Sequence, residues 1–311
     1  MKKNISPVIL MLCFGLMLLL PEEVFQGASN GLLLWFHTIL PTLFPFLLIT
    51  GLLMGTGSIV WFSRLLGPLL RKLFCVSPAG SFAILAGFLC GYPMGAKVAA
   101  DLTVQKQISR EEGAYLLSFC NNTSPGFLFH VVVLKTLGDS RFLLPSLGIL
   151  LLAPCIISLF TRNYYLKSGQ KYFPSVSPSS QGRQGWSLEL LDHCIMDSFE
   201  VLTKVGGYIM LFSVMISVLE MFVPHVPIIG ICLPLLEITN GIQMLGKTSL
   251  PLLFQYPLLL SLSAFGGCCA IAQTQCMVQK AGFPLFPYIL QKLATAVVTS
   301  LLSLIYLLYF T

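Results

Sequence analysis

The sequence predicts an all-α polytopic membrane protein with two inverted-topology repeats, each containing a re-entrant hairpin and a broken transmembrane helix. Composition is the first observation: the 311 residues are 56% hydrophobic and only 10% charged, whereas soluble domains carry about 25% charged residues. The second is that apolar stretches long enough to cross a bilayer recur along the chain. The third is that helix-breaking residues interrupt apolar stretches in both halves, a pattern typical of transporters.

Residues 1–58 are expected to contain the N-terminal transmembrane spans. Lys2 and Lys3 precede an apolar run at 5–20, and basic residues favour the cytoplasmic side, so the N-terminus is predicted to be cytoplasmic. The run is not followed by a small-residue cleavage site, so we expect this span to be retained. The apolar stretch 30–57 is long enough to form a second span.

Residues 59–162 are predicted to form the first repeat, in the order interfacial helix, hairpin, broken helix and span. Segment 59–74 mixes aromatic and basic residues, which is typical of helices that lie in the membrane interface. The apolar stretch that follows is too short to cross the membrane twice, and Gly91 and Gly95 interrupt it. We therefore expect a re-entrant hairpin that enters from the cytoplasm, with its tip near 91–95.

A broken transmembrane helix is the next predicted element of this repeat. Charged residues at 106–112 mark the return of the chain to water. The segment 113–137 then crosses outward, and Asn121 and Asn122 begin its interruption. The apolar segment 142–161 is expected to cross back to the cytoplasm.

Residues 163–187 are rich in Ser, Pro and Gly and carry basic side chains, which predicts a cytoplasmic loop between the two halves. Residues 188–311 are predicted to form the second repeat with the C-terminal span. This half begins with an amphipathic helix at 188–202 and a span at 203–223. The remaining predicted elements are a second hairpin, a second broken helix and a last span, at 228–247, 251–278 and 288–310.

The predicted site lies where the interruptions meet. The two hairpins enter from opposite sides, so a pseudo-two-fold axis in the membrane plane would bring both tips and both breaks together. Irregular backbone survives at this depth only where it is buried in protein or lines a polar cavity. The candidate solute-binding residues at these interruptions are Gly91, Tyr92, Gly95, Lys97, Asn121, Asn122, Ser124, Glu237, Thr239, Asn240, Gly266, Gly267 and Gln273.

Lys97 and Glu237 are the charged members of this set. Ionisable groups at membrane depth are rare and usually functional. The free N-terminal ends of broken helices also attract anions, because they carry partial positive charge. Two interpretations stay open: the Lys97 ammonium and the Glu237 carboxylate pair with each other, or they bind solute.

Five short motifs carry a resemblance to a known family: LPTLFPF (40–46), GYPMGAK (91–97), SFCNNTSPGF (118–127), EITNG (237–241) and SAFGG (263–267). With them the sequence resembles the sporulation integral membrane proteins of the YlbJ type, which carry nucleoside-recognition Gate domains. The resemblance covers essentially the whole chain. Gate domains are similar to the core of concentrative nucleoside transporters, whose paired hairpins and unwound helices bind solute and Na⁺.

The resemblance implies an integral membrane transporter or channel for a small metabolite, required for bacterial spore formation. The first hairpin carries Lys97 where nucleoside transporters have an acidic cation site, which favours an anionic solute. Dipicolinate is the anion moved in bulk in a sporulating cell and is therefore the candidate solute. The alternatives are a non-transporting membrane component of the sporulation machinery and a nucleoside transporter.

The other expected partner is the lipid bilayer of the bacterial cell membrane, in the mother cell or the forespore during sporulation. A homo-oligomer and assembly with other sporulation membrane proteins are both left open. We expect no nucleic-acid partner, cofactor, bound metal or enzymatic activity. The sequence has no HExxH motif and its ten cysteines form no CxxC pair. The acidic face of 188–202 is interpreted as a solvated face beside the basic loop.

Overall fold

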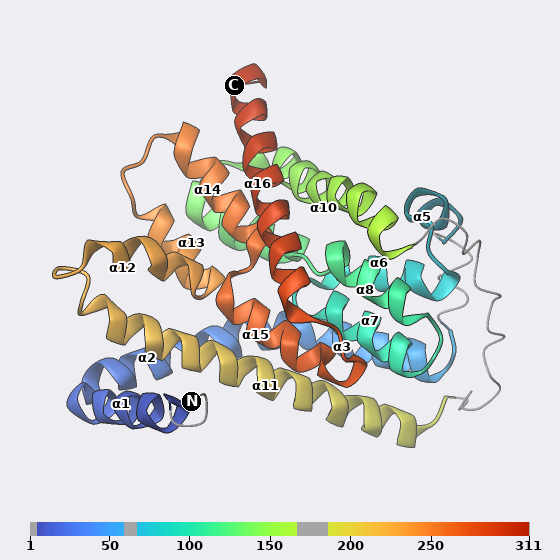
Figure 1. The fold of residues 1–311 in the computed structure, drawn as a ribbon, viewed down its shortest axis with the longest axis horizontal. Coiled ribbons are helices and arrows are strands. Elements are labelled where there is room, and N and C mark those ends of the chain that lie inside the picture. Colours follow the sequence, from blue (N-terminus) through green and yellow to red (C-terminus); the bar gives the residue numbers. More distant parts are fainter. Residues whose placement is uncertain (1–4, 59–66, 167–185, 311) are drawn as a thin grey trace.

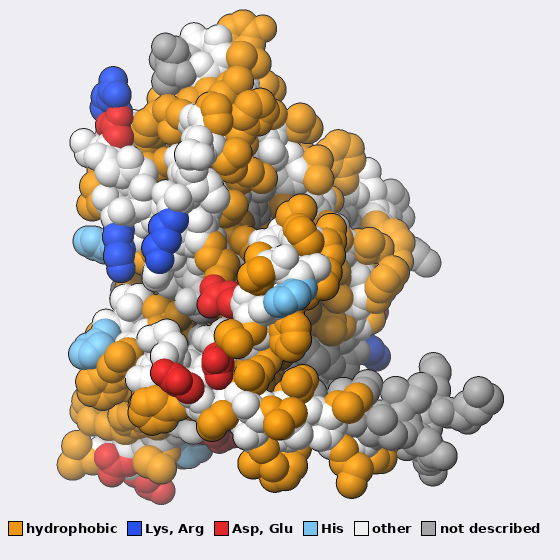
Figure 2. Space-filling view, turned by 90° about the vertical axis from the view of Figure 1, so that its left-hand side faces the viewer, with side chains coloured by type: hydrophobic (Ala, Val, Ile, Leu, Met, Phe, Trp, Pro, Cys, Tyr) orange, Lys and Arg blue, Asp and Glu red, His pale blue; other side chains and the backbone are white. Residues whose placement is uncertain are grey.

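The computed structural model describes residues 5–58, 67–166 and 186–310, and within these ranges every regular element is a helix. Five of the described helices are long and apolar enough to cross a membrane, or six if a sharply bent pair is counted as one span. Hydrophobic side chains dominate the face shown in Figure 2, and charged side chains are scattered among them. The chain is therefore an integral membrane protein whose described part is all-helical.

The N-terminal part packs along one long helix of the second half. Helices α1 (Ile5–Leu19), α2 (Pro21–Leu34) and α3 (Leu40–Gly55) follow one another, with the π-helical segment η1 (Trp35–Ile39) joining the last two. The segments α2, η1 and α3 run beside α11 (Leu188–Glu220) along the long axis of the molecule (Figure 1). The two helices can approach closely because residue 31 is a glycine. A Cβ at Gly31 would lie only 2.7 Å from the α11 backbone.

Two boundaries predicted for α2 and α11 are wrong. The second span was expected to start at residue 30, but the helix starts at Pro21 and its candidate span reaches Gly55. Proline at the first helical position and acidic residues in the first turn both favour a helix start there. Likewise, 188–202 and 203–223 are not separate elements, because α11 is one helix of 33 residues. Its packing against α2 and α3 accounts for this continuity.

The first hairpin consists of α6 (Pro78–Cys90) and α7 (Met94–Val104), which pack against each other. The predicted interruption is confirmed: α6 ends at Gly91, whose φ of 84° suits glycine. The short helix α5 (Gly67–Phe74) precedes the hairpin and meets α6 at a bend of 95°. The first part of the predicted interfacial helix, 59–66, lies outside the described residues. How the hairpin sits in a bilayer stays a prediction.

The predicted break in the next helix is also confirmed. Helix α8 (Arg110–Cys120) stops, four residues are non-helical, and the chain resumes with α9 (Pro125–Phe127) and the π-helical η2 (Leu128–Leu137). A short 3-10 turn η3 (Ser140–Phe142) leads into α10 (Leu143–Tyr165). The predicted loop at 163–187 lies mostly outside the described residues.

Glu112, at the start of α8, does not mark a return to water as predicted. Its side chain is only 3% exposed, and its Oε1 accepts a hydrogen bond of 2.6 Å from the Ser77 backbone N–H. Ser77 is the residue that caps the start of α6. The carboxylate is therefore buried because it satisfies a free N–H at the beginning of the first hairpin.

The second half also contains a broken helix, which lies between α13 and the last helix, α16. After α11 come α12 (Pro227–Cys232), the 3-10 turn η4 (Leu233–Leu235) and α13 (Ile238–Gly246). The second broken helix consists of α14 (Leu252–Phe265) and α15 (Gly267–Val278), with Gly266 at the break. A 3-10 turn η5 (Gln279–Ala281) precedes α16 (Leu285–Phe310), which runs through the middle of the view in Figure 1. The interruption predicted within 251–278 is confirmed by the break between α14 and α15.

Candidate functional site

Backbone packs directly on backbone where the first hairpin meets the break of α8. A Cβ added to Gly87 or to Gly95 would clash with the carbonyl oxygen of Cys120, the last residue of α8. A Cβ on Gly91 would lie 2.7 Å from the Ser124 backbone nitrogen, on the other side of the break. Ser124 itself caps α9 by accepting a hydrogen bond of 3.2 Å from the Phe127 N–H. The predicted residues Gly91, Gly95 and Ser124 therefore shape the site, and glycine is needed for the close approach.

Asn121, the first residue of the break, joins three other helices. Its Oδ1 accepts a hydrogen bond of 3.3 Å from the Ala96 N–H on α7. Its Nδ2 donates to Thr274 Oγ1 on α15 at 2.9 Å and to Tyr288 OH on α16 at 2.8 Å. The side chain is 1% exposed. A single amide therefore links the first hairpin to the last two helices of the chain.

Lys292 on α16 contributes a buried ammonium at the same place. The residue is 1% exposed, and its Nζ donates to the Asn121 carbonyl at 2.9 Å and to Asn122 Oδ1 at 3.2 Å. The Tyr92 ring lies over the ammonium, with its centroid 4.9 Å from Nζ. Among the described residues no carboxylate lies within 4.0 Å of Nζ. The charge is stabilised by amide oxygens and a ring, and an ammonium has three N–H donors, of which these two bonds use two.

Lys292 was missed at the level of sequence although a signal for it was present. It is the one charged residue within α16, and an ionisable side chain inside an apolar span suggests a functional site by itself. The sequence predicts 288–310 only as the last span, and no residue in it breaks the helix. Lys292 stands close to the end of that span, where a lysine usually reaches the interface.

The break of α14 meets the break of α8 directly. Gly266 has a φ of 86°, and the carbonyls of the last turn of α14 lose their helical partners there. Thr123 Oγ1 donates to the Ser263 carbonyl at 2.5 Å, and Tyr92 OH donates to the Ala264 carbonyl at 2.7 Å. Side chains from the first half thus satisfy carbonyls in the second half. The two breaks therefore contact each other as predicted, whereas a solute site at this contact stays a prediction.

A neighbouring group of polar residues with its own acid lies at the start of α13, in the region predicted as the second hairpin. Glu237 is 2% exposed and caps α13, accepting from the Thr239 N–H at 3.1 Å and the Asn240 N–H at 2.9 Å. Asn240 Nδ2 also donates to the Glu237 carboxylate at 3.0 Å and to Ser213 Oγ on α11 at 3.3 Å. The Glu237 carboxylate therefore accepts hydrogen bonds from the free N–H groups at the start of α13, and it needs no basic partner.

This second group is tied to the break of α14 through α15. The Cys269 N–H donates to the Leu236 carbonyl at 2.8 Å, and a Cβ on Gly267 would lie 3.2 Å from the Leu235 carbonyl oxygen. Gln273, one turn further on, is buried and donates to Cys269 Sγ at 3.2 Å. The predicted residues Glu237, Thr239, Asn240, Gly267 and Gln273 thus lie together, beside the cluster formed by Asn121 and Lys292.

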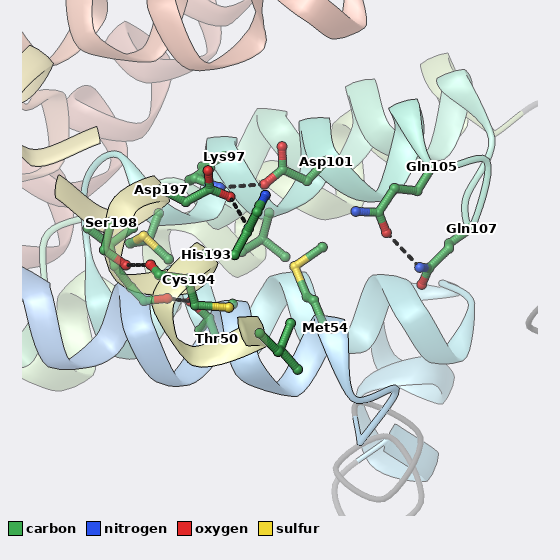
Figure 3. Close-up of a pocket in the computed structure, with 16 residues that line it drawn as sticks. Thr50, Met54, Lys97, Asp101, Gln105, Gln107, His193, Cys194, Asp197 and Ser198 are labelled. Atoms are coloured by element: carbon green, nitrogen blue, oxygen red, sulfur yellow. Dashed lines mark hydrogen bonds and ion pairs between the residues drawn. The ribbon is translucent and has the colours of Figure 1, made fainter. Parts of the chain in front are cut away.

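Lys97 belongs to neither group. It lies in a pocket of about 590 Å³ between α3, α7 and α11, and its Nζ pairs with Asp101 at 2.6 Å (Figure 3). His193 and Asp197, one turn apart on α11, lie 3.5 Å apart on another wall of this pocket. The α7 helix turns Lys97 away from the face on which Ala96 meets Asn121.

The interpretation that Lys97 pairs with Glu237 is wrong. Glu237 is bound to α11 near Ser213 through Asn240, whereas the pocket that contains Lys97 is lined by Cys194 of the same helix. About five turns of α11 separate these two positions, roughly 28 Å at 1.5 Å per residue. Each charged residue instead has local partners, Asp101 for the ammonium and the start of α13 for the carboxylate.

The described residues contain no group of three or more His, Cys, Asp or Glu side chains placed to hold a metal ion. The central cluster of Tyr92, Asn121, Asn122, Thr123 and Lys292 offers one cation, hydroxyls and amides. A set of this kind suits a ligand with negative charge and further hydrogen-bonding groups.

Comparison with known proteins gives two findings. Residues 36–140 match the family model described as "Gate: Nucleoside recognition", a range that includes the first hairpin and the break of α8. The chain is 28% identical to the sporulation integral membrane protein YlbJ of Bacillus subtilis (strain 168), over 89% of this chain and 76% of that protein. No solved structure matches significantly. The chain is therefore a membrane protein with a Gate segment that is similar to YlbJ over most of its length.

Proposed function

We propose that this protein is a membrane transporter for a small anionic metabolite and that it acts in spore formation, with dipicolinate as the first solute to test. One observation carries the proposal. Two helix breaks from distant parts of the chain meet at a buried ammonium, Lys292, that no described carboxylate neutralises. The link to spore formation comes from the similarity to a sporulation integral membrane protein.

The cost of burying Lys292 supports a role in binding. Insertion scales give about 2.5–3.5 kcal/mol for a lysine at the centre of a membrane helix, which is an upper bound for Lys292 near the start of α16, and a purely structural position gains nothing from the charge. The Asn121 carbonyl and the Asn122 amide oxygen are neutral acceptors and compensate only in part. An anionic solute would complete the neutralisation, and this favours the transport of an anion over that of a neutral nucleoside.

The surroundings of Lys292 also fit a solute site. Breaks in the α8 and α14 helices leave backbone carbonyls that only a few side chains cover, so small rearrangements can expose them. Broken helices of two halves that meet in this way are a common arrangement around transporter sites. On this proposal the two halves would have inverted topology, with the N-terminus in the cytoplasm.

Solute flux with three variants of one residue tests the proposal. Purified protein in liposomes should take up radiolabelled dipicolinate, and Lys292→Met should abolish this uptake, because methionine keeps the apolar stem and removes the charge. Lys292→Gln keeps a donor for the Asn121 carbonyl without the charge, and it should also be inactive. Lys292→Arg should retain part of the activity. The matched control is Lys280→Met, which removes an exposed lysine from η5.

Protein quantity and thermal stability of each variant must be measured beside the flux. Lys292→Met removes a buried charge but leaves the Asn121 carbonyl and Asn122 Oδ1 without this donor, so its uptake is compared per amount of folded protein and against Lys292→Gln, which keeps a donor. Uptake by Lys292→Met at the wild-type rate would contradict an anion site at this residue. Uridine uptake that ignores the variant would favour a nucleoside transporter. Heat-resistant spores formed by a flux-dead variant would favour the alternative of a non-transporting membrane component.

A further inference from the structure

We propose that Tyr92 is a gate that covers the Lys292 ammonium when the site is empty and must swing away for a solute to enter. The nature of the solute rests on the function proposed above, whereas the movement itself does not. The gate is defined by three residues of the first half: Tyr92 and Thr123, which bond to the end of α14, and Ser124, which follows Thr123 in the break and packs on Gly91.

Exposure identifies the side from which the cluster can open. Lys292, Asn121 and Asn122 are buried, at 1%, 1% and 6% exposure. Tyr92, Thr123 and Ser124 are each partly exposed. We call these three partly exposed residues the rim, and because Tyr92 and Thr123 bond to the end of α14 we infer that a solute reaches Lys292 between the rim and α14.

Few contacts close this rim. Two side-chain hydrogen bonds cross it, from Thr123 to the Ser263 carbonyl and from Tyr92 to the Ala264 carbonyl. The Tyr92 ring also rests on Gly266, where an added Cβ would lie 2.8 Å from Cζ of the ring. Glycine at this position lets the ring reach over the break. Two hydrogen bonds and one ring contact are a barrier that thermal motion can open.

The ring over the ammonium gives the gate its dependence on solute. An aromatic face attracts a cation, so the Tyr92 ring stabilises Lys292 when no anion is bound. A carboxylate interacts more strongly with an ammonium than a ring does, so a bound anion releases the ring. The empty site is then covered most of the time and opens only transiently, whereas a bound anion keeps the ring displaced, which limits leakage through an empty transporter.

The thiol of Cys120 provides a reporter for this opening. It is fully buried at the end of α8, directly before Asn121. In full-length protein in which the other nine cysteines are replaced by alanine, its reaction with small methanethiosulfonate reagents can be followed by mass spectrometry. Reagents with a sulfonate and with a trimethylammonium group report on the charge of the opened path.

Three variants separate the parts of the gate. Tyr92→Phe loses the bond to the Ala264 carbonyl and should speed Cys120 labelling about 5-fold, the effect of one hydrogen bond. Tyr92→Ala also loses the ring, and labelling should rise about 10- to 100-fold. The matched control is Tyr165→Ala: this tyrosine is also partly exposed and accepts a 2.8 Å hydrogen bond from Gln291 on α16, but it does not cover Lys292. Its labelling should equal that of the unaltered reporter protein.

The charge of the reagent tests whether the opened path leads to Lys292. In Tyr92→Ala the sulfonate reagent should be favoured over the trimethylammonium reagent, and adding Lys292→Met should remove the preference while leaving the exposure. Unchanged labelling in Tyr92→Ala, or the same rise in Tyr165→Ala, overturns the gate. A charge preference that survives Lys292→Met also overturns it. Fast labelling without any anion flux would support the gate and refute the proposed function, so the two fail separately.

Discussion

Asn121 offers the most direct test of the central cluster, because one side chain joins three helices there. The change Asn121→Ala removes one accepted and two donated hydrogen bonds in a position that is 1% exposed. A hydrogen bond between neutral groups contributes about 0.5–1.5 kcal/mol, so three of them contribute about 1.5–4.5 kcal/mol. The bond to the Ala96 N–H is long, at 3.3 Å, which favours the lower half of this range.

Thermal unfolding in detergent, followed by fluorescence-detected size exclusion, measures this loss. A change of 1 kcal/mol shifts the midpoint by about 2–4 °C in domains of 150–250 residues, so Asn121→Ala should melt roughly 5–10 °C lower. The control is Asn163→Ala, which removes an exposed amide from α10 and should melt like the wild type. If Asn121→Ala also melts like the wild type, the cluster does not hold α7, α15 and α16 together.

An isosteric change at the same residue separates stability from binding. Asn121→Asp keeps an oxygen for the Ala96 N–H, and the hydroxyls of Thr274 and Tyr288 can turn to donate to its second oxygen. It should therefore be more stable than Asn121→Ala. The new carboxylate would also neutralise Lys292, so anion uptake should be lost. Full uptake by Asn121→Asp would refute the assignment of Lys292 as the binding cation.

Other changes follow from the remaining contacts. Glu237→Gln replaces a carboxylate that accepts from the start of α13, and it should lower thermal stability by about 1 kcal/mol, as the loss of a helix cap does; equal melting would show that the cap is unimportant. Lys97→Met and Asp101→Asn break a partly exposed ion pair, and a double-mutant cycle should give a coupling free energy of only about 0.3–0.5 kcal/mol. Both variants should retain solute uptake. Loss of uptake in Lys97→Met would show that Lys97 takes part in transport. Gly31→Ala should destabilise the protein by about 1–3 kcal/mol, because its Cβ would meet the α11 backbone at 2.7 Å. Gly148→Ala, which has free space on α10, should instead stabilise it by about 0.5–1 kcal/mol, and similar melting of the two variants would contradict the close packing of α2 on α11.

Gating and binding make different demands on the same few residues. Lys292 needs neutralisation, whereas Tyr92 and Thr123 complete the hydrogen bonds of a broken helix. A solute that binds the ammonium would release the ring, and the hydroxyl of Tyr92 would then leave the Ala264 carbonyl. On the proposed function, binding would thus be coupled to the contact between the two halves, which is the link that a transporter needs between occupancy and movement.

Several features of this protein follow from local sequence alone. The apolar composition identifies a membrane protein, because too few charged groups are present to cover a soluble surface. The interruptions at Gly91, Asn121 and Gly266 were predicted correctly, because a helix break depends on the backbone preferences of a few adjacent residues. The same order of elements in the two halves also predicted that the two breaks meet, and the bond from Thr123 to the Ser263 carbonyl shows that they do.

The tertiary structure alone decided which charged residue lies at the centre. Lys97 is one turn beyond the first hairpin tip, but the rotation of α7 directs it to Asp101 and away from the breaks. Lys292 is 171 residues from Asn121 in the chain, yet the packing of α16 brings its ammonium onto the Asn121 carbonyl. The sequence shows that both lysines exist near membrane depth. Which lysine contacts the broken helices depends on how each helix is rotated and on how closely glycine lets the backbones approach. The residues next to each lysine in the sequence determine neither the rotation nor the approach.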